Sequence, residues 1–525
     1  MPSWRRSTTG YIDPNPLYAA DGFGQNTGET PPGRYTTMIQ QRLPRSTPEA
    51  EGLPSSAAEA FARGLDGLTR QGTRVHGYLL LRHGKVISEG YWSPHPADAP
   101  HQLFSLSKSF VSSAIGIAQG EGLLSIDDRL VDFFPERLTP KVTERMRRVT
   151  LRHLLTMSSG HASCALGRYR AGDVGHDWIG GFLEDELPYE PGTKFVYNSG
   201  ATFVLSAGIQ KVTGQPVSQY LRPRLFDPLG FGEVAWDRNP DGIEVGGWGM
   251  WTSVEEIAAF AQLWLQGGMW NGQQLIPRDY VAMASHKQIE NAAIPWGGPP
   301  DWNQGYGFQF WMCRYNLFRG DGYAGQVALM MPEYDIAVAM TAGSVDIQAM
   351  LDVAYRSLMN AVKHRPLPED KDALASLRAF ESSLRHELAP PAGPKVGVAA
   401  ASYRMEENPL GLRQVSIAPA GGGEGVELML EFADRTATLQ AGFHADTSRR
   451  TSLVYREPVE HVARAGWVSE QELVVNTLPV GTPSWFTLNL TFDGDRLTYR
   501  QRTPIWFRRE DRLDVTVTGK RIPTA

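Results

Sequence analysis

The sequence has few cysteines and no long apolar run. Only two cysteines, Cys164 and Cys313, occur in 525 residues. They lie far apart and form no CxxC pair, which excludes a disulfide framework and a cysteine-rich zinc site. No apolar stretch approaches the ~18 residues of a membrane-spanning helix, and no apolar run follows the N-terminal arginines as in a signal peptide. We therefore expect a soluble, cytoplasmic protein with reduced thiols.

The chain also has no excess of positively charged residues. The formal net charge is −6, and lysine accounts for only ten of the 51 Lys and Arg residues. No overall basic field exists to attract phosphate or anionic lipid, so we expect neither a nucleic-acid nor a membrane partner. Hydrophobic residues nevertheless make up 42% of the chain and include 14 Trp, 18 Tyr and 21 Phe. This composition supports a sizeable core and excludes global disorder.

The chain is longer than the ~250–300 residues that one core supports, so we expect more than one domain. Residues 1–47 are rich in Gly and Pro and indicate an extended arm. Residues 48–364 have strand-like runs at both ends and helical periodicity between them, which predicts an antiparallel sheet flanked by helices, with a mainly helical subdomain. Residues 365–394 form a helical and Pro-rich linker. Short β-rich runs in residues 395–525 predict a small antiparallel barrel or sandwich, so the fold class is α+β.

Several elements of the large domain are predicted individually. Apolar periodicity indicates one helix over Phe104–Gly120. Ser253 and Glu256 have the spacing of a capping box at the head of a second helix. Strand-like runs are predicted at Tyr306–Cys313, Gly325–Met331 and Ile336–Thr341.

The usual motifs of metal, nucleotide and α/β-hydrolase sites are absent or out of context. The sequence contains no HExxH, no GxSxG and no P-loop. Its one GxGxxG, from Gly320 to Gly325, leads into a strand and not into a helix, so it does not indicate a dinucleotide site. The 12 histidines show no metal-ligand spacing. We therefore expect neither a cofactor nor a metal.

The remaining candidate is an S-x-x-K tetrapeptide, Ser105 to Lys108. Residues three apart share a helix face, so the Lys108 amine can reach the Ser105 hydroxyl. Burial lowers the pKa of a lysine, and the neutral amine can then take the serine proton. A nucleophile in the first helical turn also has backbone N–H groups near the atom that is attacked, where they stabilise an oxyanion.

Tyr197, in PGTKFVYNSG, is a candidate for moving a proton to the leaving group. A phenol near a cation can ionise and act as a proton shuttle. Taken alone, this segment favours a half-buried core tyrosine over a catalytic one.

Four segments, in this order and spacing, resemble the serine β-lactamase and penicillin-binding-protein superfamily, specifically its class C-like hydrolases. The segments are HQLFSLSKSFVSSAIGIAQGEGLLSIDD, TLRHLLTMSSG, PGTKFVYNSG and GYAGQVALMMPEYDIAVAMTAG. The superfamily includes family VIII esterases, 6-aminohexanoate-oligomer hydrolases, D-aminopeptidases and penicillin-binding-protein-type thioesterases. The resemblance covers roughly residues 48–362 and implies a β-lactamase/transpeptidase-like domain.

The resemblance also implies roles for individual residues. It makes Ser105 the acylated nucleophile, Lys108 its base and Tyr197 the proton shuttle. The family's Tyr-x-Asn falls on Tyr197-Asn198-Ser199, with serine where asparagine is expected, so either Asn198 or Ser199 would contact the substrate. The backbone N–H groups of Ser105 and Tyr323 would form the oxyanion hole.

A third family motif, Lys-Thr-Gly or His-x-Gly, best matches Gly320-Asp321-Gly322. The missing cation and the added Asp321 carboxylate disfavour β-lactams and favour a neutral or cationic acyl substrate. Trp248 and Trp251 could line a substrate pocket, although tryptophans bury equally well in a core.

The sequence thus predicts a serine hydrolase that cleaves an amide or ester bond of a small molecule or short peptide. A transacylase or peptide-cyclising thioesterase would use the same acyl-enzyme with an amine acceptor. A non-catalytic binding protein with this fold is a third, less favoured hypothesis, because Ser105, Lys108 and Tyr197 are all retained. The expected partner is the small-molecule substrate, and a homodimer is one option for assembly.

Overall fold

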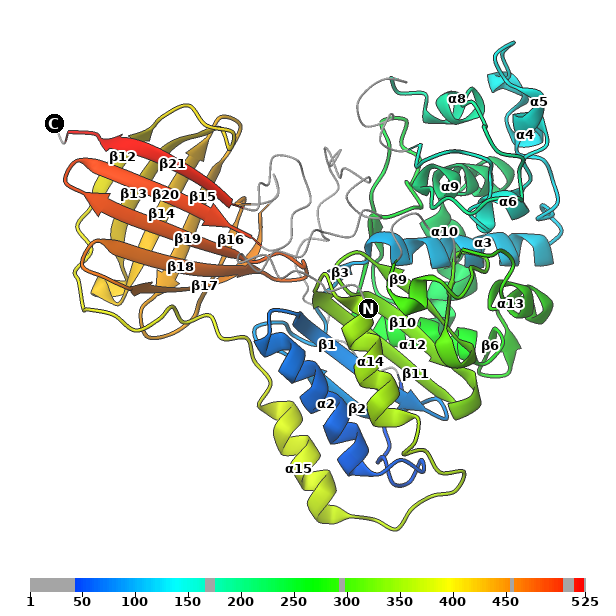
Figure 1. Cartoon of the computed structure of the whole chain (residues 1–525), viewed down its shortest axis with the longest axis horizontal. Helices are drawn as coiled ribbons and strands as arrows, with labels where there is room; N and C mark the ends of the chain where they lie inside the picture. The colour runs from blue at the N-terminus through cyan, green and yellow to red at the C-terminus, as the bar shows by residue number, and fades with distance from the viewer. Residues whose placement is uncertain (1–42, 166–174, 292–297, 454–457, 504–513, 524–525) are drawn as a thin grey trace, which may run out of the picture.

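The computed structural model describes residues 43–165, 175–291, 298–453, 458–503 and 514–523, which form an α+β domain followed by a β-barrel (Figure 1). The predicted arm lies mostly outside these ranges. Its described end, from Leu43, packs on the large domain, where Arg45 forms ion pairs with Glu89 at 3.0 Å and Glu255 at 2.7 Å.

The large domain is built around a six-stranded antiparallel sheet. It joins strands from both ends of the domain, as predicted, because β1 pairs with β11 along its whole length. Every pairing within it is antiparallel. In spatial order the strands are β2 (Lys85–Tyr91), β1 (Arg74–Arg82), β11 (Ile336–Gly343), β10 (Gln326–Met331), β9 (Leu317–Gly322) and β8 (Trp311–Cys313).

Both faces of this sheet are buried because alternate side chains enter different cores. In β1, Leu79 and Leu81 face one core, while Tyr78 and Leu80 face the other. The core that holds Tyr78 is covered by α2 (Ser55–Arg70), α14 (Ile347–Leu358) and α15 (Lys371–Ser382). The opposite core contains α12 (Val254–Leu265) and α3 (Ser107–Gly120).

A mainly helical subdomain extends the second core. Its central helix is α9 (Ser199–Thr213), which packs against α3. Within the described ranges, no helix has both the length and the apolar character needed to cross a membrane. The other α-helices described in this half are α4 (Leu130–Phe133), α5 (Glu144–Arg147), α6 (Leu151–Leu155), α8 (Trp178–Leu183), α10 (Val217–Leu221), α11 (Asp227–Leu229) and α13 (Arg278–Ala284).

The local predictions are largely confirmed, with three differences. The capping box is present, since Ser253 and Glu256 each accept the other's backbone N–H at the start of α12. The predicted Phe104–Gly120 helix is in fact a 3₁₀ turn, η1 (Phe104–Leu106), followed by α3. Strand β9 was missed because its charged side chains hide its buried character. The run predicted at Tyr306–Cys313 is a strand only at its end, in β8.

The C-terminal domain is a closed barrel, not a sandwich. Nine strands form the closed ring, which β15 and β17 complete through the pair Gly442 and Arg464, and β16 pairs with β17. Inward-facing apolar residues alternate with outward-facing ones along strands such as β14. The strands are β12 (Ala401–Met405), β13 (Leu412–Ala420), β14 (Gly425–Phe432), β15 (Thr436–Gly442), β16 (Thr447–Thr451), β17 (Val459–Trp467), β18 (Glu472–Pro479), β19 (Phe486–Asp493), β20 (Arg496–Arg502) and β21 (Asp514–Arg521).

The loop between β18 and β19 docks the barrel on the large domain (Figure 1). The backbone N–H of Gln102 donates to the Gly481 carbonyl at 3.2 Å. The guanidinium of Arg74 stacks on the Trp485 ring, 3.1 Å from its centroid. Because Gln102 lies three residues before Ser105, the barrel reaches the neighbourhood of the predicted nucleophile.

Candidate active site

Ser105 lies in the 3₁₀ turn η1, directly before α3, and is almost completely buried. The preceding residue, Phe104, has a φ of +48°, a left-handed conformation that costs a non-glycine residue on the order of 1–3 kcal/mol. Burial of the Phe104 ring, which meets the Tyr323 ring edge-on at 5.7 Å, helps to hold this conformation. The sharp turn therefore presents Ser105 at the head of α3.

The Lys108 side chain contacts three separate segments of the site. Its side chain is 1% exposed. The Lys108 amine donates hydrogen bonds to the Ser105 hydroxyl at 2.9 Å, the Ser199 hydroxyl at 3.0 Å and the Gly247 carbonyl at 2.7 Å. These contacts fix the nitrogen beside the Ser105 oxygen. A neutral amine held there can accept the Ser105 proton while it donates to Ser199 and Gly247.

Tyr197 lies beside the same amine, at the end of the segment that leads into α9. The Lys108 nitrogen is 4.7 Å from the centroid of the Tyr197 ring. The ring stacks on Trp311 at 5.5 Å and meets Tyr306 edge-on at 6.4 Å. Tyr197 is thus both a packed aromatic residue and a neighbour of Lys108, so the two interpretations of the sequence are compatible.

The sequence left open whether Asn198 or Ser199 takes part in the site. Asn198 is fully buried and caps α9, because its side-chain oxygen accepts the backbone N–H groups of Gly200 and Ala165, both at 3.0 Å. Ser199 instead contacts Lys108. The structure therefore brings Ser199 to the amine and assigns Asn198 a capping position.

Glycines let β9 approach the nucleophile turn closely. A Cβ atom added at Gly322 would lie 1.9 Å from the carbonyl oxygen of Leu103, and one added at Gly320 would lie 2.6 Å from the Leu106 side chain. Tyr323 follows directly after this strand, which places it beside η1 through its ring contact with Phe104. Glycine is thus required sterically at Gly322, where the overlap is with backbone, whereas at Gly320 the nearest atoms are the ends of side chains.

Asp321, between these glycines, does not add uncompensated charge to the site. Its carboxylate forms an ion pair with Arg319 at 2.8 Å, and both side chains are completely buried. Arg319 also lies over the Trp302 ring, 4.1 Å from its centroid. The expectation that Asp321 places a negative charge beside the substrate is therefore wrong, because its neighbour two residues away on β9 neutralises it.

Trp248 and Trp251, the predicted pocket residues, are both buried, with 7% and 2% of their surface exposed. Trp251 lies in β5 (Met250–Thr252), between β3 (His101–Gln102) and β4 (Ala235–Trp236) in a small three-stranded sheet. Trp248 contacts the Trp178 ring at 6.4 Å.

The residue that sequence reasoning missed is Gly247, which precedes Trp248 and offers its carbonyl to Lys108. A Cβ at Gly247 would lie 3.0 Å from the Ser199 carbonyl, which explains why glycine is found here. The only available signal was the cluster of three glycines around Trp248.

Comparisons with known proteins agree with this architecture. A family model described as Beta-lactamase matches residues 60–356. An uncharacterized protein from Alkalihalophilus pseudofirmus is 22% identical over 244 residues, which cover 41% of this chain and 65% of the relative. Lovastatin esterase from Penicillium rubens is 26% identical over 190 residues, which cover 32% of this chain and 47% of the esterase.

The chain thus spans less than two thirds of the length of these curated relatives. Among solved structures, a penicillin-binding-protein homologue from Caulobacter crescentus has a TM-score of 0.47 and 16% identity, over 58% of this chain and 99% of that chain. The match to the family model extends over more than half of the sequence and includes Ser105, Lys108, Tyr197 and the six-stranded sheet. The chain therefore belongs to the Beta-lactamase family.

Proposed function

We propose that this protein is a serine hydrolase that cleaves an amide or ester bond of a small molecule or short peptide through an acyl-Ser105 intermediate. The observation that supports this most directly is the buried amine of Lys108, whose nitrogen is 2.9 Å from the Ser105 oxygen. A serine hydroxyl is a weak nucleophile unless an adjacent base takes its proton, and Lys108 is placed to do so.

Acylation follows from these contacts. The Ser105 oxygen bonds to the acyl carbon while its proton passes to the neutral Lys108 amine. The backbone N–H groups of Ser105 and Tyr323 donate to the oxyanion that forms on the substrate carbonyl. The bond to the leaving group then breaks, the Tyr197 hydroxyl protonates the departing amine or alcohol, and the Lys108 ammonium returns a proton to Tyr197.

Deacylation uses the same groups in reverse. Water attacks the acyl carbon, and the Lys108–Tyr197 pair takes its proton. Collapse of the second oxyanion breaks the bond to Ser105, which recovers its hydrogen. The products are the free acid and the leaving amine or alcohol, one water molecule is consumed, and the enzyme is regenerated.

The substrate proposed is one with a neutral acyl group. The Gly320-Asp321-Gly322 segment offers no lysine or histidine for a substrate carboxylate, which disfavours β-lactams. The Arg319 ion pair removes the reason to prefer a cationic substrate.

The first prediction is that a fluorophosphonate modifies Ser105 covalently. Intact-mass and peptide analysis should find the adduct on the peptide that contains Ser105, and Ser105→Ala should prevent it. Ser113→Ala is a matched control, because Ser113 is a buried serine of α3, the helix that follows Ser105, and its hydroxyl donates to the Ser109 carbonyl one turn away. Failure of the unmodified, folded chain to acquire the adduct would exclude the acyl-enzyme proposal and favour a binding protein.

The second prediction separates hydrolysis from acyl transfer. When an activated ester is turned over with and without added amines, a hydrolase should give the free acid as its main product throughout. The product ratio is measured by chromatography. A dominant amide product would instead identify the protein as a transacylase that uses the same acyl-Ser105.

A further inference from the structure

Four histidines from distant parts of the sequence lie together where the linker to the barrel leaves the large domain. His76 is near the start of β1, His95 and His101 follow β2, and His386 follows α15. All four are buried, with 1% to 4% of their surface exposed. The sequence predicted no metal site because such sites are recognised by local spacing, and these residues are not close in the chain.

Three of the histidines face one another closely. One ring nitrogen from each of His76, His95 and His386 lies within 4.8 Å of the other two. The rings of His76 and His95 stack at 3.8 Å, and the ring of His386 meets them edge-on at 5.7 and 5.6 Å. Zinc–nitrogen bonds of about 2.0–2.1 Å in a tetrahedron hold ligand atoms roughly 3.4 Å apart. These nitrogens lie farther apart than ligands of one ion, so the side chains must rotate, and the stacked rings of His76 and His95 must open, before the three nitrogens can surround a metal.

The remaining histidine, His101, is placed to orient the ring of His76. His101 Nδ1 lies 3.0 Å from the Ala99 carbonyl, so this nitrogen carries the proton. His101 Nε2 must then accept from His76 Nδ1, which is 3.3 Å away. In this tautomer the lone pair of His76 is on Nε2. A carbonyl–histidine–histidine chain of this kind resembles the outer partners that fix metal-binding imidazoles.

Burial shields all four imidazoles from water, which disfavours their charged forms. Burial lowers the pKa of His101 to about 4 and that of His386 to about 3. Burial, together with neighbouring histidines and Arg74, also lowers the pKa of His76 and His95 well below its ordinary value. Neither ring nitrogen of His95 has a hydrogen-bond partner among the described residues, a costly arrangement that a metal bond would relieve.

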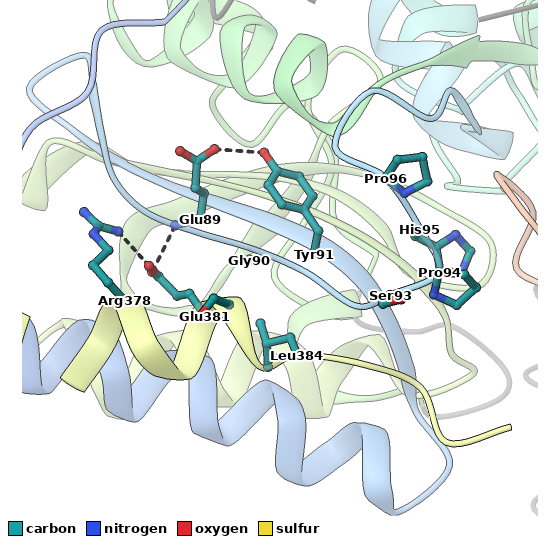
Figure 2. A pocket seen from close by; sticks show the side chains of 11 residues that line it. Glu89, Gly90, Tyr91, Ser93, Pro94, His95, Pro96, Arg378, Glu381 and Leu384 are labelled. Atoms are coloured by element: carbon teal, nitrogen blue, oxygen red, sulfur yellow. Dashed lines mark hydrogen bonds and ion pairs between the residues drawn. The ribbon is translucent and has the colours of Figure 1, made fainter. Parts of the chain in front are cut away.

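A groove of about 570 Å³ leads from solvent to His95. Figure 2 shows His95 at one end of this groove and Glu89, Glu381 and Arg378 toward the other. Both carboxylates along this groove are already paired with arginines, Glu89 with Arg45 and Glu381 with Arg378, so the groove offers a route for a cation but no excess negative charge. The positively charged Arg74 would repel a cation in the cluster. Its guanidinium is held on the Trp485 ring.

We propose that His76, His95 and His386 bind a divalent transition-metal ion, zinc in the first place, with His101 as the positioning residue. Imidazole nitrogens suit zinc, copper and nickel better than magnesium or calcium. Three protein ligands leave the fourth position of a tetrahedral zinc for a water molecule. Since His386 begins the chain that leads to the barrel, the ion would tie the linker to β1.

Metal titration of the full-length chain tests this proposal independently of any catalytic activity. After removal of metal with a chelator, the protein is titrated with Zn²⁺ against a coloured competing chelator. About one tight site per chain is expected. Loss of an outer partner typically weakens binding 10–100-fold, so His386→Asn, which removes a ligand, should weaken it by more than about 100-fold. His444→Asn changes an exposed histidine of the barrel and should leave the affinity unaltered.

A second measurement covers the case in which a variant does not fold. Co²⁺ added to the unmodified chain should give the visible absorption of tetrahedral cobalt with nitrogen ligands, and Zn²⁺ should displace it. The proposal is overturned if the unmodified chain shows only weak binding of several ions. It is equally overturned if folded His386→Asn and His95→Asn variants retain the original affinity.

Discussion

Replacing Lys108 with methionine is expected to lower kcat/KM for an activated ester by at least about 10⁴-fold. The amine is the group within hydrogen-bond reach of Ser105 that can accept its proton, at 2.9 Å. Methionine keeps most of the side-chain volume and removes the base. The Lys108→Met variant should also fail to react with a fluorophosphonate, because that reaction needs the same activated oxygen.

The same substitution should change stability far less than activity. Lysine is 1% exposed here, so its ammonium form carries a desolvation penalty that methionine removes. Against this gain, the Gly247 carbonyl and the Ser199 hydroxyl lose a donor, which costs about 1–3 kcal/mol for a buried group. These effects oppose each other, so we expect the melting temperature to remain close to that of the parent protein.

Lys141→Met is the matched control, because Lys141 is exposed and pairs with Glu184 at 3.1 Å on the surface. It should change neither kcat/KM nor labelling. If Lys108→Met kept its fold and more than about a tenth of the parent activity, a different group would have to be the base, and the assignment of Lys108 would be wrong.

The contacts around Lys108 illustrate what sequence alone can supply. Helical spacing suggested that Lys108 reaches Ser105, and the structure has this contact even though Ser105 lies in a 3₁₀ turn. The partners Ser199 and Gly247 come from segments 91 and 139 residues away. No local pattern identifies them. The choice between Asn198 and Ser199 depended on which side chain caps α9, and that is a property of the folded loop.

The sheet and the barrel show a similar division. Apolar runs indicated that strands from both ends of the large domain pair, and β1 does pair with β11. The sequence did not indicate strand β9, because charged residues are not expected in a buried strand. Arg319 and Asp321 lie two residues apart on the same side of β9 and neutralise each other inside the protein. Barrel and sandwich strands both alternate in polarity, so the sequence could not show that β15 meets β17 and closes the ring.

The histidine cluster is the clearest case of information that only the fold carries. His76 and His386 are 310 positions apart in the sequence, and each alone has the character of a buried core histidine. Their proximity follows from the path of the chain after α15, which returns to the sheet beside the segment that follows β2; there Ser93 forms a bridge with Arg385. Long-range topology of this kind determines whether separate histidines become a site.

Substitution of Gly322 by alanine is expected to damage both stability and activity. The new Cβ atom would lie 1.9 Å from the Leu103 carbonyl oxygen and 3.1 Å from the Leu106 backbone nitrogen. Both are backbone atoms, so no rotamer change relieves the overlap, and β9 must move away from the turn that carries Ser105. Overpacking of this kind costs about 1–3 kcal/mol. A displacement of about 1 Å at reacting groups lowers activity on the order of 100-fold.

Gly67→Ala provides the opposite case within the same protein. Gly67 lies inside α2, and a Cβ there would meet no atom within 4 Å. Alanine is favoured over glycine in a helix by roughly 0.5–1 kcal/mol, so this variant should be slightly more stable and fully active. Thermal unfolding and ester kinetics of both variants distinguish a steric requirement at Gly322 from a general intolerance of alanine. Unchanged unfolding and kinetics in Gly322→Ala would mean that β9 does not support the nucleophile turn, and the oxyanion position assigned to Tyr323 would then lose its structural basis.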